Sequence, residues 1–422
     1  MVYTLQPGVN LHVIETQKYK TVRFFMRFTS RLDKKTMTKR ALLTSLMETN
    51  SLHFPDQTQL SGKLADLYGA SFGMNVGRKG NFHWVNLSMS LVNGKYVEDE
   101  NLLADSVDFL REILFYPHVL GDKWEEQTFQ IEKDNLKSYL ESLKEDKQTY
   151  ASLSLQELYF DGDENQKTPS VGTIEDLESL TAKDLAEYYQ VMMAEDQIDI
   201  FVVGDVTEAE VVKLMKQLPF AARDVQRPEI FYTQPVDNIV KERQVQEPVV
   251  QGKLNLGYST DIYYGQNDRF ALIVFNGLFG GFPHSKLFMN VREKESLAYY
   301  ASSSVDTFRG FMSVQTGIES KNRQRVLHLI NQQLESLKKG EISELEMEQT
   351  KAMLVNQYLL SLDNSQAAVE TDYLNFWLPQ TEISDEEWLR QIENVTVKDV
   401  QRIAAKIKLQ AIFFLDGVGA HE

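Results

Sequence analysis

The segment from Asn276 to Ser304 combines a glycine-rich stretch with an arginine and a tyrosine, seven residues apart. It reads NGLFGGFPHSKLFMNVREKESLAYYASSS. We predict a glycine-rich turn, then a helix that carries Arg292 and Tyr299, and then a strand of small residues. Seven residues make about two helical turns, so both side chains would project from one side of such a helix. A guanidinium and a phenol placed in this way are suited to clamp or polarise a peptide carbonyl.

Each of these residues also has a plain structural interpretation. Arg292 can form a salt bridge with Glu293 or Glu295, and Tyr299 can simply pack. His284 is placed to meet a peptide, and the alternative is an ordinary loop histidine. The glycines either form a helix cap and turn or let a substrate backbone approach closely. They are Gly277, Gly280 and Gly281.

Length, charge and composition restrict the function classes. A chain of 422 residues is long enough for two or more domains. The net charge of −17 argues against general nucleic-acid binding, which needs a basic footprint. The chain has no cysteine, so disulfides and thiolate metal ligands are excluded. No apolar run reaches the ~18 residues of a membrane span, and the N-terminus lacks the pattern of a signal peptide. We therefore expect a cytoplasmic protein with no membrane partner.

The sequence indicates an internal duplication. The stretch Leu67 to Phe82 resembles Leu297 to Phe311, and each predicts a helix end followed by two strands. Thr181 and Thr396 each open a helix with an acid three residues later, which is the pattern of a capping box. An apolar strand follows each helix, at 198–206 and at 411–418. The spacing predicts two homologous domains of about 200 residues.

The predicted fold class is α+β, with a mostly antiparallel sheet covered by helices in each domain. Strands are expected at 11–15, 21–28 and 86–91, and long amphipathic helices at 102–115 and 124–143. The strand at 86–91 alternates apolar and polar residues, so we expect one packed face. Four prolines interrupt the middle of the chain and predict an irregular linker. The resulting domains are 1–218 and 249–422, joined by a linker at 219–248 with Pro219, Pro228, Pro235 and Pro248.

Nearly the whole chain resembles the pitrilysin/insulinase-type (inverzincin) zinc peptidases, in particular subunits of the mitochondrial-processing-peptidase type. In the second half, several residue types agree with the family at fixed spacing. They are Ser285-Lys286-Leu287-Phe288, Val291-Arg292-Glu293-Lys294 and Tyr299. In the first half, the family's turns correspond to Ser30-Arg31-Leu32-Asp33 and Leu67-Tyr68-Gly69-Ala70.

The sequence departs from the family at the zinc helix, where the motif His-x-x-Glu-His is expected. Two registers fit the segment from Ala41 to Leu46. One puts Leu42 and Leu46 at the histidine positions and Ser45 at the base, and the other uses Ala41, Ser45 and Thr44. Neither register offers an imidazole or a carboxylate base. The third-ligand position falls near Tyr139, and Glu132 resembles an accessory glutamate of the family.

We predict no metal site in this chain. The seven histidines are interpreted as surface or packing residues, because no two of them lie within five residues of each other. They are His12, His53, His83, His118, His284, His328 and His421.

The resemblance implies a subunit, inactive alone, of a two-subunit zinc metallopeptidase. A homologous partner would carry zinc and the general base, and this chain would add Arg292, Tyr299 and the glycine-rich segment to a site for a peptide substrate. The alternative is a non-catalytic structural or peptide-binding protein, acting in a modification or maturation pathway. A self-sufficient enzyme is disfavoured, because the sequence contains no constellation of base and metal or of base and nucleophile.

Overall fold

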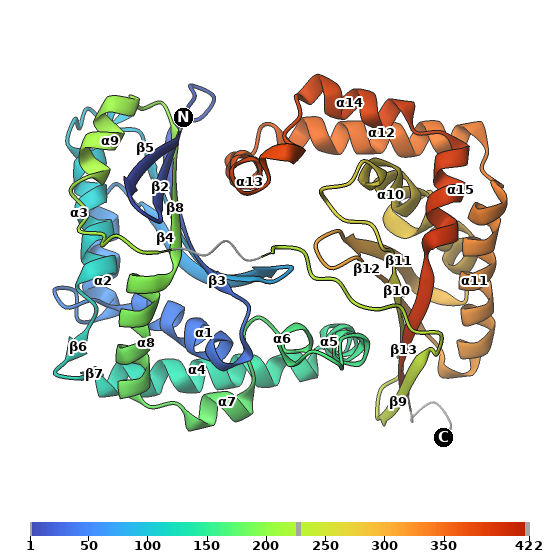
Figure 1. Cartoon of the computed structure of the whole chain (residues 1–422). Coiled ribbons are helices and arrows are strands. Elements are labelled where there is room, and N and C mark those ends of the chain that lie inside the picture. The colour runs from blue at the N-terminus through green and yellow to red at the C-terminus, as the bar shows by residue number, and fades with distance from the viewer. Residues whose placement is uncertain (1, 225–228, 418–422) are drawn as a thin grey trace. The chain divides into compact units, whose positions relative to one another are not determined.

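The computed structural model describes residues 2–224 and 229–417, so Pro228, Val418 and His421 lie outside the described residues. Contacts divide the chain into two compact units, each built around one sheet (Figure 1). The first unit contains residues 1–142, 168–229 and 363–373, and the second contains 143–167, 230–362 and 374–422. The two units therefore exchange segments along the sequence. The domain boundaries predicted at 218 and 249 stay a prediction.

The first unit has a six-stranded sheet with the order β1-β2-β8-β3-β5-β4. Only β2 and β8 pair in parallel, and the other described pairs are antiparallel. The strands are β1 (Val2–Gln6), β2 (Val9–Glu15), β3 (Thr21–Arg31), β4 (Ser71–Lys79), β5 (Phe82–Val92) and β8 (Gln197–Gly204), with a separate hairpin of β6 (Val119–Leu120) and β7 (Lys123–Trp124). The helices are α1 (Lys34–Thr49), α2 (Gln57–Asp66), η1 (Gly94–Tyr96), α3 (Leu102–Phe115), α4 (Glu126–Glu145), α7 (Ile174–Ser179), α8 (Ala182–Glu195) and α9 (Glu208–Met215).

Helices α1, α3, α8 and α9 lie on one face of this sheet (Figure 1). The other face receives the start of α13 (Ser365–Trp377), a helix from late in the sequence. Arg27 of β3 is 1% exposed and forms an ion pair with Glu370 of α13. Its guanidinium carbon lies 4.1 Å from the ring of Trp84 and 4.3 Å from that of Tyr373. The sequence predicts one packed face for strand β5. Its polar face is packed as well, because Asn86 is buried and its side-chain oxygen accepts a hydrogen bond from Nε of Arg27.

The second unit has a five-stranded sheet with the order β11-β12-β10-β13-β9. The strands are β9 (Lys241–Glu247), β10 (Gly252–Ser259), β11 (Ala298–Asp306), β12 (Phe311–Ile318) and β13 (Lys408–Gly417). Only β13 and β9 pair in parallel among the described strands of this sheet. The helical segments are α5 (Lys147–Tyr159), α6 (Glu164–Lys167), α10 (Asp268–Asn276), η2 (Gly277–Gly281), η3 (Phe288–Lys294), η4 (Ser320–Asn322), α11 (Arg323–Lys339), α12 (Glu344–Ser361), η5 (Pro379–Thr381), α14 (Asp385–Asn394) and α15 (Val397–Lys406).

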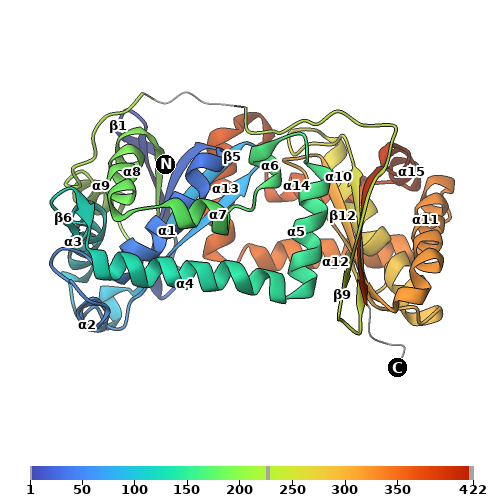
Figure 2. The ribbon, with the colours of Figure 1, turned by 90° about the horizontal axis from the view of Figure 1, so that it is seen from below.

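Alternation along β10 separates the two faces of this second sheet. Leu254, Leu256 and Tyr258 pack into a core formed with α10, α11, α12 and α15. On the opposite face, α5 packs its apolar side against Phe311 of β12 and Phe413 of β13 (Figure 2). Both units thus match the predicted class of a mostly antiparallel sheet covered by helices.

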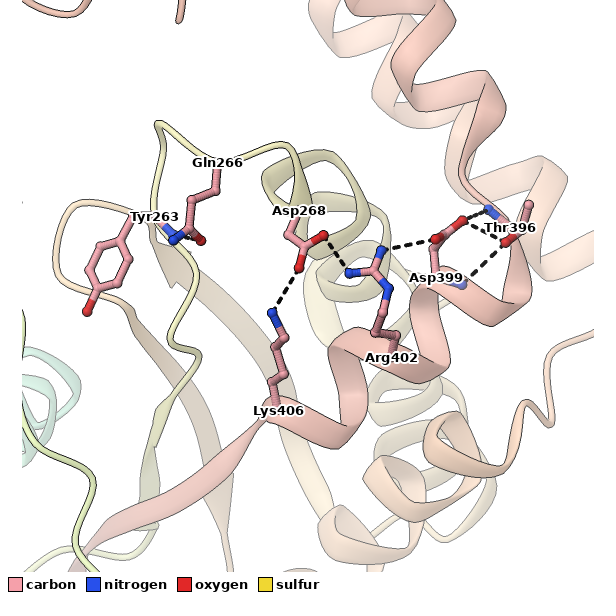
Figure 3. Close-up of polar contacts among 7 residues, drawn as sticks. All are labelled: Tyr263, Gln266, Asp268, Thr396, Asp399, Arg402 and Lys406. Atoms are coloured by element: carbon pink, nitrogen blue, oxygen red, sulfur yellow. Dashed lines mark hydrogen bonds and ion pairs between the residues drawn. The ribbon is translucent and has the colours of Figure 1, made fainter.

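The two capping boxes predicted from the duplication are confirmed at the starts of α8 and α15. In α15, Thr396 caps the backbone N–H of Asp399, and the Asp399 carboxylate accepts from the backbone N–H of Thr396 (Figure 3). Arg402 and Lys406 of α15 both bind the carboxylate of Asp268, the first residue of α10 (Figure 3). The two contacts measure 2.5 and 2.9 Å. These contacts connect the duplicated helix to the helix that leads into the candidate site.

The interpretation of 219–248 as irregular is wrong at its end, because Lys241 to Glu247 form β9. Exposed and half-buried residues alternate along this edge strand, and most of them are charged or polar. The strand therefore resembles the irregular, proline-bearing stretch that precedes it. Across residues 2–224 and 229–417, no helix has the length and apolar character that crossing a bilayer requires.

Candidate functional site

The glycine-rich segment is helical, so the predicted turn is wrong. Helix α10 continues without a break into η2, a π-helix over Gly277–Gly281. The chain turns at Phe282 to Ser285, and a second helical segment begins at Lys286 and widens into the π-helix η3 over Phe288–Lys294. Wide helical turns of this kind are rare and are often found at functional sites.

Arg292 lies near the end of η3 with its side chain 40% exposed. The guanidinium carbon is 4.4 Å from the ring centre of Phe288, and Nε is 3.7 Å from the carboxylate of Glu293. Glu295, the other candidate partner, instead pairs with Arg325. Exposed ion pairs contribute at most about 1 kcal/mol, so the contact with Glu293 leaves the Arg292 guanidinium available to another acceptor.

Tyr299 lies on strand β11, so the prediction that one helix carries both residues is wrong. The helix ends at Lys294, and Ser296 adopts a left-handed conformation with a φ of 54°. The backbone N–H of Leu297 donates to the carbonyl of Val291 at 3.2 Å, which joins the end of the helix to the start of the strand. The two residues thus come from adjacent elements linked by a backbone hydrogen bond.

A β-bulge directs the Tyr299 side chain outward. Ala298 pairs with Ile318 and Tyr300 with the next residue, Gly317, so Tyr299 has no partner position on β12. Its side chain is 58% exposed. Bulges redirect side chains and are common beside active sites. The sequence reasoning missed this bulge, although two consecutive tyrosines in a strand of small residues are a signal, since neighbours in a regular strand face opposite sides.

The glycines and His284 have structural roles in this unit. A Cβ on Gly277 would lie 2.7 Å from Thr350, and one on Gly280 would lie 2.6 Å from the hydroxyl of Ser303. His284 places Nε2 2.9 Å from the Thr350 hydroxyl and stacks on Phe282. Burial lowers the pKa of His284, which favours a neutral ring. Internal packing therefore explains Gly277 and Gly280, and substrate contact at these positions and at the exposed Gly281 stays a prediction.

The segment that corresponds to the family's zinc helix is part of α1, and it is packed as core. Leu42 and Leu46 are fully buried. Two carboxylates lie near the end of α1, and both are engaged in hydrogen bonds within the protein. Glu132 of α4 accepts from the hydroxyl of Thr49, and Glu48 of α1 accepts from a backbone N–H of β4. Burial, together with the charge of Glu132, raises the pKa of Glu48. The side chains at the ligand positions do not fit a zinc ion in either register.

No group of three or more acidic or histidine side chains is placed to hold a metal ion within residues 2–224 and 229–417. Tyr139, at the loosely aligned third-ligand position, is exposed on α4. The structure therefore suggests no substitute for the missing ligands, and the absence of zinc in the protein stays a prediction.

Two similar α+β units, one of which has no histidine or glutamate at the place of the metal motif, define a peptidase-like protein without the usual metal ligands. Residues 179–354 match the family model described as "Peptidase M16 inactive domain". The chain is 37% identical over 413 residues to the Bacillus subtilis (strain 168) protein named "Probable inactive metalloprotease YmfF", covering 97% of this chain and 96% of that protein. The chain therefore belongs to the peptidase M16 family, and the resemblance found in the sequence is confirmed.

Solved structures share the fold of this chain. The structure titled as a conserved protein from Enterococcus faecalis V583 is 59% identical, with a TM-score of 0.97 over 100% of this chain and 99% of that chain. A peptidase M16 inactive domain from Pseudomonas fluorescens has a TM-score of 0.78 at 18% identity, over 100% of this chain and 99% of that one. The second likeness supports the fold alone.

Proposed function

We propose that this chain is the subunit without zinc in a two-subunit metallopeptidase that processes peptides. The main support is the contrast between the two halves of the sequence. In the first half, no histidine or glutamate occupies the positions of the metal motif, and Leu42 and Leu46 are buried there as core residues. In the second half, Arg292 and Tyr299 stay exposed on adjacent elements, within a segment that retains the family's residue pattern.

In this proposal a homologous partner holds zinc, the activated water and the general base. Arg292 and Tyr299 bind the carbonyl of the scissile peptide bond and donate hydrogen bonds as its oxygen gains negative charge. The guanidinium is positively charged throughout, and the phenol is a neutral donor. The two groups would therefore stabilise the transition state more than the uncharged substrate. No cofactor is assigned to this chain, and its cytoplasmic location stays a prediction.

A second candidate function is a structural or peptide-binding role without catalysis. It is favoured by the packing of Gly277, Gly280 and His284 against the protein's own side chains. The gene neighbourhood distinguishes the two candidates at low cost. A neighbouring gene of similar length that encodes His-x-x-Glu-His supports the two-subunit peptidase.

The test is peptide cleavage by the chain co-purified with such a partner. Arg292→Ala and Tyr299→Phe should each lower the cleavage rate by roughly 10²–10³ if each removes one donor to the oxyanion. If the two residues act on one oxygen, the double variant should be less impaired than the product of the single effects. Size-exclusion chromatography should show unchanged assembly.

Matched controls use the same residue types at exposed positions outside the site. Arg390→Ala removes an exposed guanidinium of α14, and Tyr116→Phe removes an exposed phenol at the end of α3. Both should cleave at the rate of the unmodified complex. Unchanged rates for Arg292→Ala and Tyr299→Phe in an assembled complex would exclude the catalytic role and favour the structural one.

A further inference from the structure

The second unit contains a cavity of about 580 Å³ between α11, strand β10 and the junction of α15 with β13. Helices α11 and α15 both lie on the side of the sheet opposite α5 (Figures 1 and 2). The floor of the cavity is apolar and buried, with Leu256, Leu334 and Ile407. This volume is within the ~300–1,000 Å³ typical of small-molecule sites.

The floor also contains a polar group without a partner. Tyr258 lines the cavity and is 3% exposed. Its hydroxyl has no hydrogen-bond partner in the part of the chain that the structure describes. A hydroxyl that lines a cavity without a protein partner is free to donate to an occupant. Burial raises the pKa of Tyr258, which keeps the hydroxyl neutral and able to donate.

The polar lining is basic or neutral. Lys338 of α11 and Lys408 at the start of β13 line the cavity together with His328 and Asn331. The described lining includes no carboxylate. Lys338 pairs with Glu335 at 2.8 Å, but both side chains are partly solvated, so this pair is weak. In a chain with a net charge of −17, a cavity lined by two lysines favours an anion.

We propose that this cavity is a binding site for a small amphipathic carboxylate. The apolar part of the ligand would lie on Leu256, Leu334 and Ile407, and the carboxylate would contact Lys338 and Lys408. The hydroxyl of Tyr258 would donate a hydrogen bond to the ligand. The lining of this site includes neither Arg292 nor Tyr299, so the proposal does not depend on the proposed peptidase role.

Isothermal titration calorimetry with decanoate tests the proposal on the full chain. We expect saturable binding at one site per chain, and at least tenfold weaker binding of decan-1-ol, which has the same tail without the charge. N-acetyl-Leu-Leu, as its free acid and its amide, tests the other source of such a carboxylate, the apolar end of a peptide. Preference for the free acid over the amide would identify a peptide terminus as a ligand.

Variants locate the binding. Leu327→Trp should fill the cavity and abolish binding, whereas Lys338→Gln and Lys408→Gln should each weaken it roughly tenfold. Tyr258→Phe removes only the hydroxyl and should weaken binding about fivefold without unfolding the protein, because no protein hydrogen bond to it is lost.

Lys339→Gln is the matched control, since this exposed lysine neighbours Lys338 but does not line the cavity. It should bind decanoate like the unmodified chain. The proposal is overturned if no ligand binds saturably, if decan-1-ol binds as well as decanoate, or if folded Leu327→Trp still binds.

Discussion

His83 is a buried histidine that serves packing and hydrogen bonding in the first unit. Its Nε2 lies 2.8 Å from the carbonyl of Ser170, which can only accept, so this nitrogen carries the proton. Burial first, and then the positive charge of Arg40, lowers the pKa of His83 to about 3. The sequence interpretation of the histidines as surface or packing residues fits this position. The sequence cannot give the pKa, because the depth of burial depends on segments distant in the chain.

This depressed pKa predicts a pH dependence of stability. Between about pH 6.5 and pH 3 the unfolded chain binds a proton at His83 that the folded chain does not, so stability falls as the pH falls. In urea unfolding between pH 7.5 and 5, the unmodified protein should lose about 2 kcal/mol more than His83→Gln. Burial opposes protonation of His12, but Asp199 and Asp372 raise its pKa overall. His12 is present in both proteins, so its contribution to the pH dependence cancels in the difference between them. Parallel stability curves would show that His83 does not titrate in this way.

The elements themselves were largely predictable from local patterns. Helix α3 has the predicted bounds of Leu102 to Phe115, and the two capping boxes are found where the threonine and aspartate pairs predicted them.

The wrong prediction that Tyr299 lies on the same helix as Arg292 has a physical cause. Ser296 ends the helix in a left-handed conformation without the glycine or proline that usually marks such an end. The π-helices were also missed, since they depend on packing against β11 and α12 rather than on a local pattern.

The packing of η2 predicts that its second glycine cannot be enlarged. Gly280→Ala would place a Cβ 2.6 Å from the hydroxyl and 2.7 Å from the backbone nitrogen of Ser303, so we expect a loss of about 1–3 kcal/mol in unfolding free energy. Gly62→Ala in α2 is the control, because its Cβ would meet nothing within 4 Å. It should stabilise the protein by roughly 0.5–1 kcal/mol. Equal effects of the two substitutions in thermal or urea unfolding would contradict this account of η2.

The docking of α13 on the first sheet depends on polar contacts. Glu370 binds Arg27 and also accepts from Lys79 at 3.1 Å. Glu370→Ala would leave Arg27 buried without its carboxylate, at a cost of roughly 2–3 kcal/mol. Hydrogen exchange measured by mass spectrometry should become faster in residues 363–377.

Asp363→Ala gives the control on the same segment. Its carboxylate lies 3.8 Å from Lys18, and both side chains are largely exposed, so the exchange rates should hardly change. Slow exchange in Glu370→Ala would mean that the contacts of Glu370 are not needed to hold the segment.

At the scale of the whole molecule, the predicted class of two similar α+β units agrees with the structure. The exchange of segments was not visible in the sequence, because local periodicity carries no information about which sheet a helix will cover. Residues 147–159 pack on the second sheet, and residues 363–373 on the first. The comparisons support an inactive relative of metallopeptidases, and the partner remains part of our proposal.

The whole chain should contain no stoichiometric zinc and cleave no peptide alone. The residues from Ala41 to Leu46 offer neither zinc ligands nor a carboxylate base. Elemental analysis after gel filtration, combined with a peptide assay on the isolated chain, checks this. About one tightly bound zinc per chain would contradict the prediction, as would turnover that is lost in Arg292→Ala of the pure protein.

This chain is synthesised from its N-terminus, so all six strands of the first sheet have been made once Gly204 has left the ribosome. The residues that cover one face of that sheet, 363–373, are made much later. During that delay Arg27 lacks its carboxylate and the sheet keeps an uncovered face, whereas α5 is made before the second sheet that it covers. Domains usually mature in the order of synthesis. In this protein the first unit is complete only when residues 363–373 of the second half have been made. A gene divided between the two repeats would therefore encode a first half that lacks the segment packed on its sheet.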